Sequence, residues 1–77
     1  MTDSELQASL NRLARLSNAI QEEAERRYGK TGFLFFEAGG GLHVMDGDAN
    51  YKSGAEERQS HIRFSANILS RMGAGAW

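Results

Sequence analysis

The chain has 77 residues and contains no cysteine and no proline. The absence of cysteine excludes disulfides and thiolate metal sites, and it is compatible with the cytoplasmic location that we expect. The absence of proline leaves helical segments uninterrupted. Because nine glycines are present, we expect the ends of the elements to fall at glycines.

The chain also lacks an excess of positive charge and a long apolar run. Nine Lys and Arg oppose ten Asp and Glu, for a net charge of -1, so no strong positive field attracts a polyanion. We consider three functional hypotheses, and weak nucleic-acid binding, in which Arg12 and Arg15 would contact phosphates, is therefore the third of them. No apolar run approaches the ~20 residues of a membrane span, and the first residues lack the order of a signal peptide. The composition, 40% hydrophobic, predicts one soluble domain over residues 1–77 with no membrane contact.

What is present begins with an amphipathic helix, predicted over about residues 3–28. Thr2 and Glu5 have the spacing of a capping box, and Gly29 suits the end of the helix. One apolar stripe repeats at steps of three, four and seven residues. Its members are Leu6, Leu10, Leu13, Ile20 and Ala24, with Leu16 on the flank.

A β-hairpin is predicted over about residues 32–46. The apolar runs Phe33–Phe36 and Leu42–Met45 flank the glycine-rich bend 39–41, which is typical of two strands joined by a short loop. The favoured register places Glu37 opposite Leu42. A slip of one residue, with Glu37 opposite His43, is the alternative.

A second helix is predicted over about residues 54–72. Ser53 and Glu56 again have capping-box spacing, and an apolar stripe follows through Ala55, Ile62, Ala66, Leu69 and Met72. A glycine-rich tail, residues 73–77, ends on Trp77. The sequence thus predicts an α+β helix–hairpin–helix domain, αββα, with two helices on a two-stranded antiparallel sheet.

Such a domain leaves apolar surface uncovered. With both helices on one face, either Phe33 and Phe35 or Leu34 and Phe36 point toward water. The first helix would be nearly 40 Å long, at about 1.5 Å per residue, whereas strands of about six residues span about 20 Å. Both mismatches are relieved if two copies pair, so we expect a homodimer that extends the sheet or pairs the helices.

We therefore predict a non-enzymatic protein-interaction module that binds itself and another protein. Its aromatic anchors would be Phe33, Phe35 and Trp77. It could act as an inhibitor or adaptor of a larger complex. The short, cysteine-free chain has the general look of small bacterial or phage-borne proteins.

The second hypothesis is a calcium-binding module. Asp46, Asp48, Asn50 and Glu57 stand at positions 1, 3, 5 and 12 of a calcium-loop pattern. Against this reading, position 6 is Tyr51 instead of glycine, and the loop follows a strand rather than a helix.

No catalytic or cofactor site is expected. His43 and His61 are the only histidines, and no third metal ligand can be identified to accompany them. The sequence also lacks the Gly-x-Ser-x-Gly motif that would supply a serine nucleophile. The Gly-Lys-Thr triplet at residues 29–31 lies between a helix and a strand, the reverse of the order that a phosphate-binding loop needs.

Overall fold

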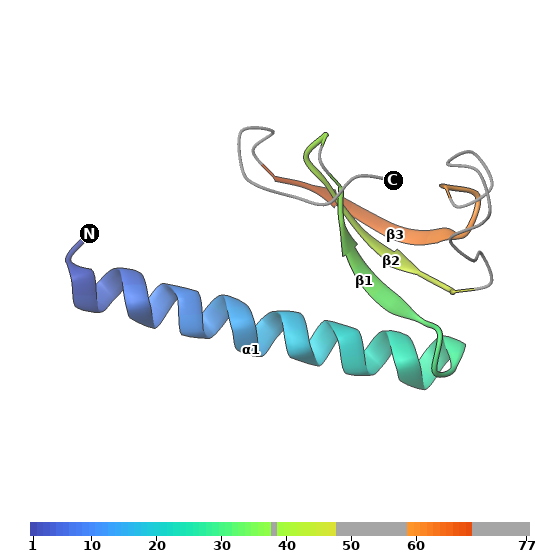
Figure 1. Ribbon diagram of the computed structural model, residues 1–77, viewed down its shortest axis with the longest axis horizontal. Coiled ribbons are helices and arrows are strands. Elements are labelled where there is room, and N and C mark those ends of the chain that lie inside the picture. The colour runs from blue at the N-terminus through green and yellow to red at the C-terminus, as the bar shows by residue number, and fades with distance from the viewer. Residues whose placement is uncertain (38, 48–58, 69–77) are drawn as a thin grey trace.

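The computed structural model of the chain describes residues 1–37, 39–47 and 59–68. These residues form a long helix followed by three strands: α1 (Asp3–Tyr28), β1 (Phe33–Phe36), β2 (Gly41–Met45) and β3 (Ile62–Asn67). The strands make one antiparallel sheet in the order β1-β2-β3. The fold is α+β, with α1 lying along one side of the sheet (Figure 1).

Local signals explain both ends of α1. The Thr2 hydroxyl accepts a hydrogen bond from the Glu5 backbone N–H at 3.1 Å, and the Glu5 carboxylate accepts one from the Thr2 N–H at 3.0 Å. At the other end, Gly29 adopts a positive φ of 84° and donates its N–H to the Glu25 carbonyl. The predicted first helix and its capping box are therefore confirmed.

The hairpin is confirmed, but both registers considered for it are wrong. Phe36 lies opposite Leu42 and Phe35 opposite His43. The Glu37 N–H donates to the Gly41 carbonyl at 2.7 Å, and the Gly40 N–H donates to the Glu37 carbonyl at 3.0 Å. The turn is tighter than expected because Gly40 takes a positive φ of 97°, which allows Gly41 to belong to β2 rather than to the bend.

The prediction of a second helix over residues 54–72 is wrong over residues 62–67. Residues 62–67 form β3, and the sheet has three strands instead of two. Ile62, Phe64 and Ala66 alternate with polar residues, so the segment also has the period of a strand. Pairing with β2 supplies its backbone groups with hydrogen-bond partners. Of the rest of that predicted helix, residue 59 is helical, residues 60 and 61 lie in a turn, and residue 68 follows β3. Its other residues and the predicted tail lie outside the described residues.

Strand pairing sorts the sheet residues onto two faces. Val44 lies opposite both Leu34 and Phe64, and this face looks toward α1. His43 lies opposite both Phe35 and Ser65, on the face that looks away from α1. The helix therefore covers the row of Leu34 and Phe36 rather than that of Phe33 and Phe35.

Gln21 ties α1 to the start of the sheet. Its side-chain oxygen accepts a hydrogen bond from the Leu34 N–H at 2.8 Å, and its side-chain nitrogen donates to the Gly32 carbonyl at 3.1 Å. Gly32 lies so close to α1 that a Cβ there would overlap the Ala24 carbonyl oxygen. The helix and the chain entering β1 thus approach each other closely at this point.

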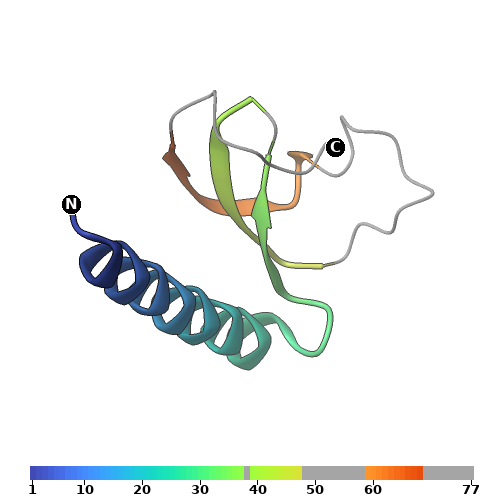
Figure 2. The same cartoon turned by 60° about the vertical axis from the view of Figure 1, so that its left-hand side comes forward.

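The helix is longer than the sheet that it covers. Its 26 residues span about 39 Å at 1.5 Å per residue. Its C-terminal half lies against the sheet, whereas its N-terminal half runs beyond the strands (Figures 1 and 2). The only buried apolar residues in the described part of the chain are Ala24 and Met45, so its core is small.

Candidate interaction surface

Four leucines lie exposed on the N-terminal half of α1. Leu6, Leu10, Leu13 and Leu16 are each between 49% and 60% exposed. They continue the helical line that includes Ile20 and Ala24, and Ala24 is only 1% exposed against the sheet. One apolar stripe is therefore covered by strands at one end and open to solvent at the other. We call Leu6, Leu10, Leu13 and Leu16 the leucine stripe.

An open groove lies where the leucine stripe meets the sheet. It has a volume of about 300 Å³. Its lining is mostly apolar and comes from Ala19, Ile20, Glu23, Ala24, Arg27, Val44 and Phe64. Phe64 is 52% exposed, and the Arg27 guanidinium carbon lies 5.5 Å from the centre of its ring, a distance typical of a cation–π contact. The groove therefore combines an apolar floor with charged groups at its edge.

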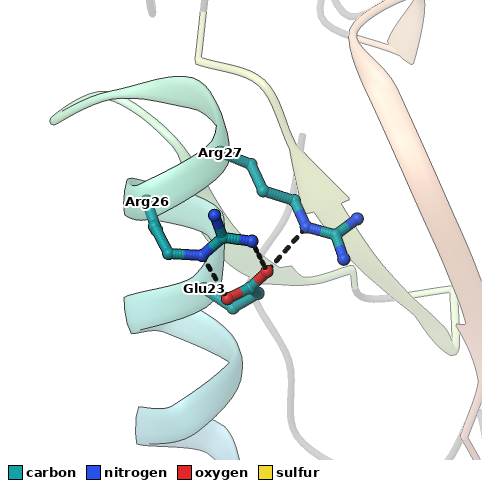
Figure 3. A network of polar contacts seen from close by, with 3 residues as sticks. All are labelled: Glu23, Arg26 and Arg27. Carbon is teal, nitrogen blue, oxygen red and sulfur yellow. Dashed lines mark hydrogen bonds and ion pairs between the residues drawn. The ribbon is translucent and has the colours of Figure 1, made fainter.

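The two charged residues at this edge, Glu23 and Arg27, belong to a network on α1 that also includes Arg26, shown in Figure 3. The Nε of Arg26 donates to Oε1 of Glu23 at 2.8 Å, and the Nε of Arg27 donates to Oε2 at 2.7 Å. These hydrogen bonds lower the pKa of Glu23 to about 2. The carboxylate remains ionised at neutral pH and holds Arg27 beside the groove, while Arg26, which does not line the groove, binds the same carboxylate.

A second polar group crosses the sheet on the face away from α1. Nδ1 of His43 lies 2.8 Å from the Ser65 hydroxyl, and Nε2 lies 3.3 Å from a carboxylate oxygen of Glu37. Both contacts are satisfied if the ring carries its proton on Nε2 and the Ser65 hydroxyl donates to Nδ1. A Cβ at Gly41 would overlap Glu37 and His43, so glycine leaves the space in which this pair meets.

This hydroxyl, imidazole and carboxylate resemble the parts of a general-base site, but other features favour a structural role. His43 and Ser65 are direct cross-strand partners, and such pairs stabilise sheets. The groove lies on the opposite face, beside Val44 and Phe64. We interpret the three residues as a polar row that links β1, β2 and β3.

Asp46, the first residue of the calcium-loop pattern, is buried and already lies beside Arg63 and His61. The Nε of Arg63 donates to its Oδ2 at 2.7 Å, and Nδ1 of His61 lies 2.9 Å from its Oδ1. The contact between His61 and Asp46 does not have the geometry of a hydrogen bond. Because the Asp46 carboxylate is bound by Arg63, it suits a structural role better than the binding of a calcium ion.

The other calcium-pattern residues, Asp48, Asn50 and Glu57, lie outside the described residues, so the calcium site stays a prediction. Within residues 1–37, 39–47 and 59–68, no three His, Asp or Glu side chains gather in a way that could hold a metal ion.

The structure describes two of the three predicted aromatic anchors. Phe33 and Phe35 are half-buried on the sheet face away from α1, with ring centres 6.4 Å apart in an edge-to-face arrangement. Trp77 lies outside the described residues. The leucine stripe was recognised in the sequence as a helical stripe, and the excess length of the helix was the signal that half of it would be uncovered.

Arg12 and Arg15, proposed as phosphate contacts, are both exposed on α1. They stand on the half of the helix that runs beyond the sheet, away from the hairpin (Figure 1). Nucleic-acid binding stays a prediction.

In the part of the chain that the structure describes, no helix combines the length and the apolar character needed to cross a membrane. No protein-family model, curated protein or solved structure matches this chain significantly.

Proposed function

We propose that the protein is a non-enzymatic protein-interaction module that forms a homodimer through the leucine stripe of α1. The observation that carries this proposal is the exposure of four leucines on the same helical line that packs against the sheet farther along. An exposed apolar stripe on a regular helix is typical of a protein–protein contact.

Helix stability supports the same conclusion. The N-terminal half of α1 runs beyond the sheet, and an isolated helix of fewer than about 12–15 residues is marginal in water. The capping box at Thr2 stabilises its first turn by only about 1 kcal/mol. Packing against a second copy would supply the tertiary contacts that most protein helices need.

The leucines alone give a weak dimer. Full burial of an exposed leucine side chain contributes about 1.5–3 kcal/mol, so covering the exposed half of each contributes about 1 kcal/mol. Four leucines in each of two copies therefore contribute about 8 kcal/mol, against an association cost of about 4–15 kcal/mol. A dimer that persists at micromolar concentration needs further buried surface. Once the helices pair, the sheet face away from α1, which carries Phe33 and Phe35, remains for another protein, as an adaptor or inhibitor requires.

The test is the solution mass of the protein across a dilution series, compared with two glutamate variants. Leu13→Glu places a charge in the leucine stripe, while Ala8→Glu places the same charge at an exposed position on the opposite side of the helix. We expect the unmodified protein and Ala8→Glu to show about twice the 8.5 kDa chain mass, and Leu13→Glu to show the mass of one chain.

Leu13 is 49% exposed within the subunit, so its replacement should leave the sheet and the C-terminal half of α1 folded, and any helical circular dichroism signal that is lost should not exceed the contribution of the N-terminal half. The reading fails if the unmodified protein is monomeric at every concentration, or if Leu13→Glu dimerises as well as Ala8→Glu.

A further inference from the structure

We propose that the two copies pair with antiparallel α1 helices, so that the first helical turn of each copy covers the groove of the other. This inference rests on the proposed function. It adds an orientation and makes the groove part of the interface.

The position of the sheet sets the orientation. The sheet packs on the C-terminal half of α1, on the same line that carries the leucine stripe in the N-terminal half (Figures 1 and 2). If two stripes met with parallel helices, both sheets would stand at the same end between the two helices and would collide. Antiparallel helices place the sheets at opposite ends. A two-fold axis relates the copies in that arrangement, as is usual for dimers.

The spacing of the stripe restricts the antiparallel registers to a few, and we choose the one that pairs Leu10 with Leu13 of the partner subunit because it brings the first turn to the groove. Leu6, Leu10, Leu13, Ser17 and Ile20 follow each other at alternating steps of four and three, the repeat of a coiled-coil seam. In an antiparallel pair, Leu10 lies opposite Leu13 of the partner subunit. Leu6 then lies opposite Ser17 of the partner subunit, where the small, half-buried serine leaves room for it.

This register carries the first turn of one helix to the groove of the other. Asp3 comes opposite Ile20 of the partner subunit, at the mouth of the groove. The open apolar floor includes Val44 and Phe64, and it would be covered on association. The acidic first turn also points toward the edge that carries Glu23 and Arg27, where Arg26 and Arg27 together outnumber the single carboxylate, so the net charges of the two surfaces are opposite. The groove thus supplies the buried surface that the leucines alone lack.

The residues that flank the seam are uncharged. Gln7 and Ala14 lie on one side, and Ser9 and Leu16 on the other. Flanking charges, which set the orientation of many coiled coils, are therefore absent over this stretch. The position of the sheet, rather than the charge of the flanking residues, therefore selects the antiparallel pair.

The orientation can be tested by cross-linking, because the natural chain has no cysteine. Gln7 and Ala14 face each other across an antiparallel seam, whereas Ser9 and Ala14 do so across a parallel one. We would mix the Gln7→Cys and Ala14→Cys variants, and separately the Ser9→Cys and Ala14→Cys variants, and treat each mixture with a short bismaleimide. The proposal predicts a mixed cross-linked dimer in the first mixture and at least tenfold less in the second.

The solution mass of the cysteine variants, measured under reducing conditions, distinguishes a failure of the proposed homodimer from a failure of the proposed orientation. Monomers at every concentration would overturn the proposed function and this inference with it. Dimers that cross-link preferentially in the second mixture, or equally in both, would overturn the antiparallel orientation and leave the homodimer standing.

Coverage of the groove has its own readout in the methyl signals of Val44. Val44 lies on the sheet, away from the leucine stripe itself. We expect its NMR shifts to differ between the dimeric protein and the Leu13→Glu monomer, and to match between the dimeric protein and Ala8→Glu. Identical Val44 signals in all three proteins would show that the partner helix stops short of the groove and would overturn this part of the inference.

Discussion

Replacement of Gln21 by alanine should lower the free energy of unfolding by more than is usual for a residue on the surface of a helix. The Gln21 side chain accepts from the Leu34 N–H at 2.8 Å and donates to the Gly32 carbonyl at 3.1 Å. Both backbone groups are part-buried. Removing a partner from a buried polar group costs about 1–3 kcal/mol, so the two lost contacts should together lower the free energy of unfolding by about 2–4 kcal/mol.

Gln21→Glu separates the two contacts. The carboxylate can still accept from the Leu34 N–H, but it cannot donate to the Gly32 carbonyl and places negative charge beside that oxygen. We therefore expect a loss of stability between those of the unmodified protein and Gln21→Ala at pH 7.

Urea unfolding followed by circular dichroism measures these differences. The measurement belongs in the Leu13→Glu background at one fixed protein concentration, because dimerisation makes apparent stability depend on concentration. Glu22→Ala, a change at the neighbouring exposed position, is the matched control and should cost less than about 0.5 kcal/mol. A loss for Gln21→Ala no larger than for Glu22→Ala would refute the view that this side chain anchors the helix to the sheet.

Two further perturbations test the turn after β2 and the network at the groove. Gly47→Ala should lower the free energy of unfolding by about 3 kcal/mol or more, because Gly47 has a φ of 79° and a Cβ there would overlap the Thr31 carbonyl; thermal unfolding of wild-type stability would contradict this. The pKa of Glu23 falls from 4.5 to about 2 on folding, so its contribution is present above pH 4.5 and is lost as the pH falls toward 2. Glu23→Gln should flatten that part of the pH–stability curve relative to Glu22→Gln, by a small amount because the network is half-exposed, and parallel curves for the two variants would contradict the assignment.

The helix and the hairpin were predictable because local chemistry determines them. The capping box at Thr2, the cap at Gly29 and the two apolar runs around the glycines each act within a few residues. The third strand was not predictable in the same way. Residues 62–67 fit both a helical stripe and a strand alternation, and the choice depends on the free edge of β2, which is distant in the sequence.

The candidate surface was predictable in part. The length of the helix against that of the strands indicated that half of the apolar stripe would lack a cover. The sequence did not reveal the groove beside Phe64, because that residue was assigned to a helix and its pairing with Val44 was therefore unknown. The partners of Asp46 were missed for the same reason, since His61 and Arg63 reach it only after β3 pairs with β2.

The polar row through Glu37, His43 and Ser65 bears on how the chain avoids misfolded pairings. A glycine-rich bend constrains the alignment of two strands weakly, and a shift of one residue turns every side chain to the other face. Such a shift in β2 would carry the imidazole of His43 to the apolar side beneath α1, away from both polar partners. A buried imidazole without partners is costly, so the misaligned hairpin lies well above the native state in free energy. His43 thus disfavours an alignment of the hairpin that is shifted by one residue, because that alignment leaves the imidazole without hydrogen-bond partners.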